Sequence, residues 1–302
     1  FEWKTIFNWS KNNSMVESLP EGIDKIQIGS GVYNVKSYAE VGKPYGAIYA
    51  KTFKRDAEGY ILCQLDGSPK EGQDYEYLGC VQADWRGGWN NVFRLGNFSF
   101  SVMFDFQKGG KFFSQTSIQS SVDGQSVKSL EGRDADFFSR KILGESDEER
   151  YGFMRPQNAN TPTANGQIYP DWGRPKGVVL PNCRYDEDVE GLAGQQVLGY
   201  CTPERYWMHY TSRDISRFIY DASYVKLREI TVSYDLPKKW LRKTPFQTFR
   251  VAAVGRNIAT LFANTPHGLD PQATSTTGNA QGFERGFNLP SATYGFDIKV
   301  SF

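Results

Sequence analysis

The chain has 302 residues, 15% of them aromatic, and its 35 Lys and Arg residues nearly balance 34 Asp and Glu residues, giving a net charge of +1. This balance excludes the broad basic field with which proteins attract nucleic acid. Mean hydropathy is −0.54, and no stretch approaches the ~18 consecutive apolar residues of a membrane-spanning helix. A membrane barrel stays compatible with these values, because its strands alternate apolar and polar residues.

The first predicted strand covers residues 1–10, where alternate positions fall on opposite faces. A polar turn follows at 11–23, and weaker alternation over 24–38 predicts a second strand. Residues 39–85 are rich in Gly and Pro, so we expect a long loop that carries short hairpins. One face of the first strand is aromatic apart from a threonine; its members are Phe1, Trp3, Thr5, Phe7 and Trp9.

The clearest strand pair lies within residues 89–107. Gly96-Asn97 is a tight-turn dipeptide, and the residues after it alternate strictly between apolar and mostly polar side chains. This alternation is typical of barrel strands with one face toward lipid and one toward the lumen, although a soluble sandwich strand would show it too. The residues that we expect to face lipid here are Phe98, Phe100, Val102, Phe104 and Phe106.

Residues 108–213 lack periodicity, and about 100 residues without strands exceed an ordinary connection. Further strands are predicted over 218–234 and 246–262, joined by a short, basic connector at 235–245, with a loop at 263–290 before the last strand. That strand also alternates, and the residues that we expect to face lipid are Tyr294, Phe296, Ile298, Val300 and Phe302.

About seven strands result, and their connections alternate between short and long. This sorting is typical of outer-membrane barrels, so the predicted fold class is all-β, a transmembrane antiparallel β-barrel segment. A complete single-chain bacterial barrel has an even number of strands, and we therefore expect residues 1–302 to be the C-terminal portion of a larger barrel. The short turns are 11–23, 96–97 and 235–245, and the large loops, expected to be extracellular, are about 39–85, 108–213 and 263–290.

Several sequence motifs, in order along the chain, carry a family resemblance. They are VGKPYG at 41–46, DWRGG at 84–88, DASYVKLREITVSYDLP at 221–237, VGRNI at 254–258 and GLDP at 268–271. Together they resemble the SusC/RagA-type TonB-dependent outer-membrane transporters, and the resemblance spans nearly the whole chain.

The resemblance implies a 22-stranded barrel in the bacterial outer membrane, of which this chain would supply wall and outer loops. The expected partners are the remaining barrel and plug, TonB through the N-terminal part, a SusD-like surface lipoprotein and membrane lipid, but no nucleic acid. The imported nutrient would be a glycan or an oligopeptide. The resemblance implies no cofactor and no enzymatic activity.

No catalytic or metal site is recognisable. His209 and His267 have no partners at a telling spacing, and the acidic run at 186–191 lacks the bidentate Glu of a calcium loop, because Val197 stands at the twelfth position. Sugar rings stack on aromatic faces and Arg binds carboxylates, whereas strand-end aromatics such as Trp89 and Tyr210 suit an interfacial girdle. The candidate substrate-binding residues are Trp85, Arg86, Tyr206, Trp207 and Arg213.

Four cysteines, Cys63, Cys80, Cys183 and Cys201, allow three disulfide pairings. Neighbours in sequence would give Cys63–Cys80 and Cys183–Cys201, which suits an oxidising compartment. Four unpaired thiols are the alternative, and the spacings resemble no zinc site.

Two other functions compete with transport. A soluble β-sandwich that binds glycan through exposed aromatics would explain the alternation, but not the sorted connections. A secreted hydrolase is disfavoured, because no sequence motif identifies a pair of carboxylates as catalytic.

Overall fold

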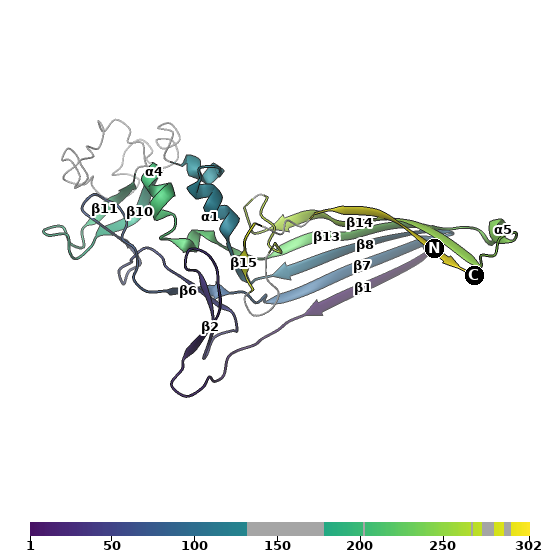
Figure 1. The fold of residues 1–302 in the computed structure, drawn as a ribbon, viewed down its shortest axis with the longest axis horizontal. Helices are drawn as coiled ribbons and strands as arrows, with labels where there is room; N and C mark the ends of the chain where they lie inside the picture. The colour runs from purple at the N-terminus through teal and green to yellow at the C-terminus, as the bar shows by residue number, and fades with distance from the viewer. Residues whose placement is uncertain (132–177, 202, 267, 274–280, 287–290) are drawn as a thin grey trace.

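The computed structural model describes residues 1–131, 178–201, 203–266, 268–273, 281–286 and 291–302. Figure 1 shows an elongated molecule with a sheet of long strands at one end and a group of shorter elements at the other. Both chain ends lie at the strand end, where the short helix α5 (Lys238–Leu241) also lies, but at opposite edges of the sheet.

A six-stranded antiparallel sheet, here called the wall sheet, forms the strand end. Its strands follow the alternating segments of the sequence, because each such segment can present one face of a single chemical type. In sheet order they are β1 (Glu2–Ser10), β7 (Trp85–Leu95), β8 (Phe98–Lys108), β13 (Tyr224–Asp235), β14 (Thr248–Ala263) and β16 (Thr293–Ser301).

The connections of the wall sheet are sorted by length between its two ends. The turn at 96–97 and the connector at 236–247 lie at one end, and the longer connections 11–84, 109–223 and 264–292 leave the other. All three long connections therefore begin and end at the same end of the wall sheet.

Two expectations for the region before β7 are wrong. Because β1 pairs directly with β7, residues 11–23 are not a short turn and 24–38 is not a wall strand. Residues 24–40 instead form β2 (Lys25–Ser30) and β3 (Lys36–Glu40), which pair as a hairpin. The chain reverses between them through Tyr33 and Asn34, both with positive φ, and this reversal accounts for the weak alternation.

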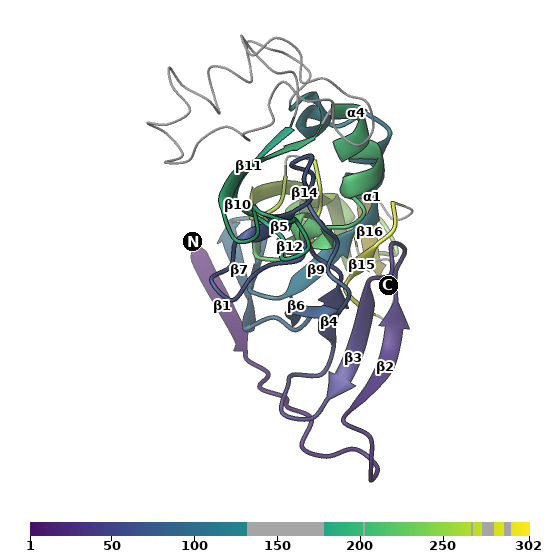
Figure 2. The ribbon, with the colours of Figure 1, turned by 90° about the vertical axis from the view of Figure 1, so that its left-hand side faces the viewer.

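The described residues of the three long connections form a compact loop module of three small sheets. Figure 2 views this end and shows β2 and β3 projecting away from the rest. The sheets are β2-β3-β4 (Ala47–Ala50)-β6 (Glu76–Cys80), β11 (Gln196–Cys201)-β10 (Val178–Tyr185)-β5 (Ile61–Cys63), and β12 (Ile219–Asp221)-β9 (Lys111–Ser114)-β15 (Phe283–Glu284).

The region 108–213 thus contains strands that periodicity did not predict. Short strands buried on both faces lack alternation, and β9 is such a segment, since three of its four residues are buried. The same region holds α1 (Gln115–Val122) and the 3-10 helix Val127–Leu130. It ends with the short helical turns α4 (Pro203–Arg205) and Tyr206–Tyr210, and a further 3-10 helix, Ile215–Phe218, follows the region. None of the described helices has the length and apolar character needed to cross a membrane.

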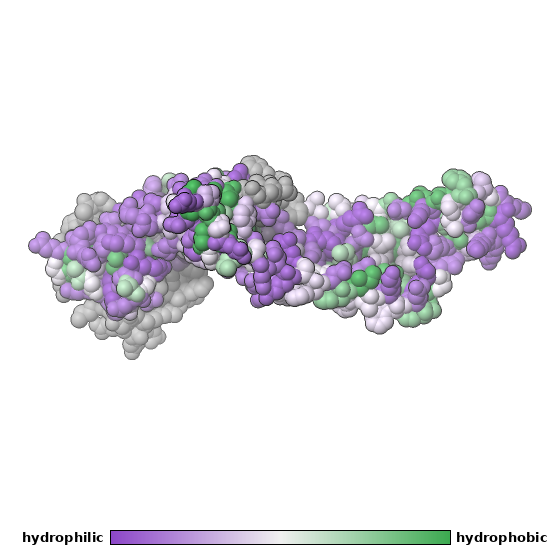
Figure 3. Space-filling model, turned by 90° about the horizontal axis from the view of Figure 1, so that it is seen from below, coloured by the Kyte–Doolittle hydropathy of each residue, from purple (hydrophilic) through white to green (hydrophobic). Residues whose placement is uncertain are grey.

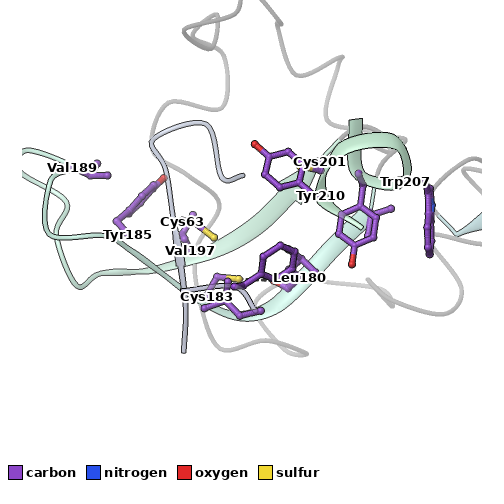
Figure 4. Close-up of a cluster of buried hydrophobic side chains, with 13 residues drawn as sticks. Cys63, Leu180, Cys183, Tyr185, Val189, Val197, Cys201, Trp207 and Tyr210 are labelled. Carbon is purple, nitrogen blue, oxygen red and sulfur yellow. Dashed lines mark hydrogen bonds between the residues drawn. The ribbon is translucent and has the colours of Figure 1, made fainter. Parts of the chain in front are cut away.

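Two hydrophobic cores stabilise the loop module. One gathers β5, β10, β11 and the turn Tyr206–Tyr210, and Figure 4 shows its side chains converging between these elements. The other joins β4 and β9 to α1 and β15, with Ile48, Phe113, Ile118 and Phe283 at its centre. The second core packs together segments of all three long connections.

The expected pairs Cys63–Cys80 and Cys183–Cys201 are not formed, because Cys63, Cys80 and Cys201 are free thiols in the structure. Cys63 and Cys80 lie in different sheets, and in the β10–β11 ladder Cys201 is opposite Val178 whereas Cys183 is opposite Val197. A hydrogen bond with Cys183 and burial raise the pKa of the Cys63 thiol. Burial raises the pKa of Cys201 to about 12, so both groups stay protonated at neutral pH.

Candidate functional site

The register gives the wall sheet two chemically different faces, because directly opposed residues share a face. Phe100 lies opposite Phe93 on β7 and Val232 on β13, and Phe296 lies opposite Ala253 on β14. Many of these side chains are exposed; Phe98 retains 58% of its surface and Phe296 86%. Figure 3 shows hydrophobic patches along the strands, while hydrophilic residues predominate over the loop module.

All the residues expected to face lipid within β8 and β16 lie on this apolar face. Phe302 follows β16, and its ring packs against Phe246 with centroids 5.3 Å apart. The shared face is therefore present, and contact with lipid stays a proposal.

Two polar residues on the apolar face are satisfied by tryptophans. Thr5 and Asn91 lie opposite each other on β1 and β7. The indole Nε1 of Trp89 donates to Thr5 Oγ1 over 2.9 Å, and Trp3 Nε1 donates to Asn91 Oδ1 over 3.2 Å. Both polar groups on the apolar face, the Thr5 hydroxyl and the Asn91 amide oxygen, are therefore hydrogen-bonded to an indole of a neighbouring strand.

The opposite face is polar and carries ion pairs between neighbouring strands. Arg94 Nη1 lies 3.4 Å from Glu2 Oε2, and Arg256 Nε lies 2.9 Å from Glu229 Oε2. Arg250 binds both carboxylate oxygens of Asp235, at 2.6 and 2.7 Å. Such a surface suits contact with water.

Where the polar face meets the loop module, a hydrogen-bonded network fixes the connection 264–292. Lys226 is only 1% exposed, and its ammonium donates to Asp270 Oδ1 over 2.6 Å and to Gln272 Oε1 over 2.9 Å. A register shift around Arg228 lets its guanidinium reach Asp105 and Gln272. The buried charges are thus paired, as burial requires.

Of the candidate substrate residues, Trp85 and Arg86 point to opposite faces of β7, yet both line a pocket of about 310 Å³. Neighbours along a strand point to opposite faces, and Trp85 lies on the side of Gly87 and Phe106. Arg86 lies on the polar face and lines two pockets of about 310 and 240 Å³. Arg213 lies elsewhere in the loop module, with its guanidinium 4.8 Å from the ring centroid of Tyr210.

Tyr206 and Trp207 are core residues, each 1% exposed, which corrects the expectation that they contact substrate. Their rings meet edge to face with centroids 5.1 Å apart. Trp207 Nε1 donates to the backbone oxygen of Glu131 over 3.2 Å, and the Tyr206 hydroxyl accepts from Arg217. Figure 4 places Trp207 and Tyr210 in the same core as Cys201.

Sequence reasoning missed the residues that surround Arg86 in the two pockets. They include Gln107, Tyr224, Gln272 and Gln281. Glutamine and tyrosine carry no motif of their own, and these four come from two wall strands and a distant connection. Of the four, only the position of Gln107 was indicated by the sequence, because alternation placed it on the polar face of β8.

Comparison with known proteins places the two-faced sheet and its loop module in a family context. No family model matches the chain. The TonB-dependent receptor P3 of Formosa agariphila is 23% identical over an alignment of 316 residues, covering 97% of the chain and 25% of the relative. The RagAB peptide importer matches in its open-open and closed-closed states, with TM-scores of 0.51 and 0.53 at 15% identity, covering 99% of the chain and 27% of that structure.

The chain is thus similar in sequence to a TonB-dependent receptor and similar in fold to part of the RagAB peptide importer. It spans about a quarter of the length of these relatives. The resemblance carried by the sequence motifs is therefore confirmed, and the described residues are mostly β, as the predicted fold class requires.

Proposed function

We propose that the chain supplies wall strands and outer loops to a barrel that imports a nutrient across the bacterial outer membrane, driven by TonB. The two faces of the wall sheet carry the proposal. One face exposes rows of Phe, Trp and Ile, which suits lipid, and the other bears ion-paired side chains, which suits a wet lumen. A soluble sandwich would cover the apolar face with a second sheet, and none of the described strands does so.

The sorting of the connections supports an orientation. Outer-membrane barrels carry short turns on the periplasmic side and long loops outside. The loop module then faces the exterior, and the connector 236–247 lies at the periplasmic rim. Its Trp240 is 60% exposed and can anchor at the membrane interface beside the solvated Lys238 and Lys239.

The partners follow from the same proposal. A SusD-like lipoprotein covers the loop module from outside, and a plug and earlier strands complete the transporter and contact TonB. The similarity to a TonB-dependent receptor and to the RagAB peptide importer supports this assembly. The cargo is an oligopeptide or a glycan that enters along the polar face, and the chain itself performs no catalysis.

An epitope tag tests membrane integration and orientation together. One tag is inserted after Gly22, an exposed turn of the connection 11–84, and the matched tag after Gly96 in the β7–β8 turn; a Cβ at either position meets open space. In intact cells, antibody should label the first tag, and the second only after the outer membrane is permeabilised. The reverse pattern would overturn the orientation, and recovery of either protein in the soluble fraction would overturn membrane integration.

A further inference from the structure

Arg86 occupies a distinctive place on the polar face, at the junction with the loop module. On β7 it lies opposite Ser10 of β1 and Gln107 of β8. Its side chain lines both junction pockets, of about 310 and 240 Å³, and the two pockets also share Val81 and Gln281. The two hollows therefore meet around one guanidinium.

Arg86 has no ion pair among the described residues, whereas the cations around it do. Neither pocket is lined by an Asp or Glu of the described chain. Among the described residues, no carboxylate that lines these pockets neutralises the positive charge of Arg86. The paired neighbours are Lys226 with Asp270, Arg228 with Asp105, and Lys111 with Asp221.

Uncharged hydrogen-bonding groups make up most of the remaining polar lining. The amides are those of Asn12, Gln82, Gln107, Gln272 and Gln281. Gln107 is held in place because its Nε2 donates to the backbone oxygens of Ala222 at 3.1 Å and Gly109 at 3.2 Å. Amide groups both donate and accept hydrogen bonds, so they suit hydroxyls and peptide groups of a polar solute.

The backbone that carries Gln281 is also fixed. Gly282 has φ +85°, and a Cβ there would overlap the Val81 side chain. The backbone oxygen of Gly282 accepts from the Phe113 amide over 2.8 Å, which ties this connection to β9. Gln281 and Val81 are therefore placed before any ligand arrives, and preorganised groups bind more tightly.

We infer that Arg86 forms an anionic subsite on the polar face, which binds the carboxylate of an imported solute. The planar guanidinium matches a carboxylate in a two-point hydrogen-bonded contact, and the surrounding amides bind the uncharged part of the solute. A carboxylate reaches this subsite from an acidic peptide or from an acidic sugar. This subsite rests on the proposed function, because it lies on the lumen-facing side of the barrel wall.

The test uses the full-length transporter, purified in detergent with its bound partners, and calorimetric binding of two probe pairs. One pair is a pentapeptide with a central Glu and its Gln counterpart, both amidated; the other is a tetragalacturonate and its methyl ester. Arg86→Gln should weaken the carboxylated probe about tenfold and its uncharged partner less than about twofold. Arg86→Lys should be intermediate, because an ammonium lacks the fork.

Arg94→Gln is the matched control, since Arg94 lies on the same strand and face but is paired with Glu2; it should change neither affinity. The pair that discriminates identifies the source of the carboxylate as peptide or sugar. Equal weakening of both members of a pair by Arg86→Gln, or no preference of the wild-type protein for either carboxylated probe, would overturn the subsite. Correct labelling of the Gly22 and Gly96 tags in that case would leave the barrel proposal intact.

Discussion

Trp3 and Asn91 are joined across two strands on the apolar face, with the indole Nε1 3.2 Å from the amide Oδ1. Asn91 is 3% exposed, so water cannot replace the indole. Trp3→Phe should therefore cost about 1–3 kcal/mol of folding free energy, measured as the urea midpoint of the heat-resistant barrel band. Trp9→Phe is the control, because the Trp9 indole donates no hydrogen bond within the described chain, and equal losses would contradict the assignment.

Arginine substitutions distinguish the two faces of β8. Phe100→Arg, or Phe104→Arg, should destabilise the assembled transporter by about 2–4 kcal/mol if the residue lies near the bilayer midplane. Ser101→Arg, on the polar face between them, should cost much less. The amount of folded protein in liposomes across a urea series measures both, and similar tolerance on the two faces would rule out lipid contact.

Lys226→Met should loosen the connection 264–292. Its removal leaves Asp270 without the cation that holds it at 2.6 Å, at a cost of up to about 3 kcal/mol, less where water reaches the carboxylate. Faster amide hydrogen exchange over residues 268–273 is the expected signal. Adding Asp270→Asn to Lys226→Met should restore part of the protection. Lys238→Met, at an exposed position, is the control and should have no effect on exchange. Equal loss of protection in Lys226→Met and Lys238→Met would count against the network.

Acid should weaken the loop module at Asp186. Burial alone would raise the pKa of this carboxyl, but hydrogen bonds from Lys70 and Lys54, at 2.6 and 2.9 Å, lower it below the ordinary 3.8. A lowered folded-state pKa stabilises the fold above the unfolded-state pKa, and this contribution is lost as pH falls through the folded-state value. Exchange in β5 and β10, corrected for its intrinsic pH dependence, should therefore rise below about pH 4. Asp186→Asn should start less stable and lose this dependence, and an unchanged acid response in that variant would exclude Asp186 as its origin.

Gly282→Ala should destabilise the junction more than Gly22→Ala. Both glycines have φ near +80°, but only at Gly282 would a Cβ overlap Val81. Both variants carry about 1–2 kcal/mol of backbone strain, and the overlap adds about 1–3 kcal/mol. Exchange at residues 281–286 and thermal midpoints compare the two. Val81→Ala should relieve only the additional loss, and a Gly22 variant as unstable as the Gly282 variant would show that strain alone acts.

Prediction from sequence succeeded where the signal was local. The strict alternation over 98–106 and the Gly96-Asn97 turn specify a hairpin within 20 residues of chain, and the structure has it as β7 and β8. The apolar face of β16 was equally predictable, because each side chain alternates with a polar one.

The rest depended on contacts that alternation does not encode. An aromatic beside an arginine looks the same in sequence whether it is exposed or buried, and Tyr206 and Trp207 are buried. The indole partners of Thr5 and Asn91 come from neighbouring strands, so only the register reveals them. The pockets around Arg86 could not be predicted either, because residues of all three long connections line them.

The parallel pairing of β9 with β15 joins segments 170 residues apart, where Ser114 Oγ donates to Glu284 over 2.5 Å. The entropic cost of closing such a loop grows with its length, and contacts between distant segments slow folding. β15 lies between β14 and β16 in sequence, so the loop module can be completed only after most of the chain has left the ribosome. Until then Phe283 is missing from the core that holds Phe113 and Ile118, and the apolar surface that it would cover is a site at which chaperones bind and unassembled chains aggregate.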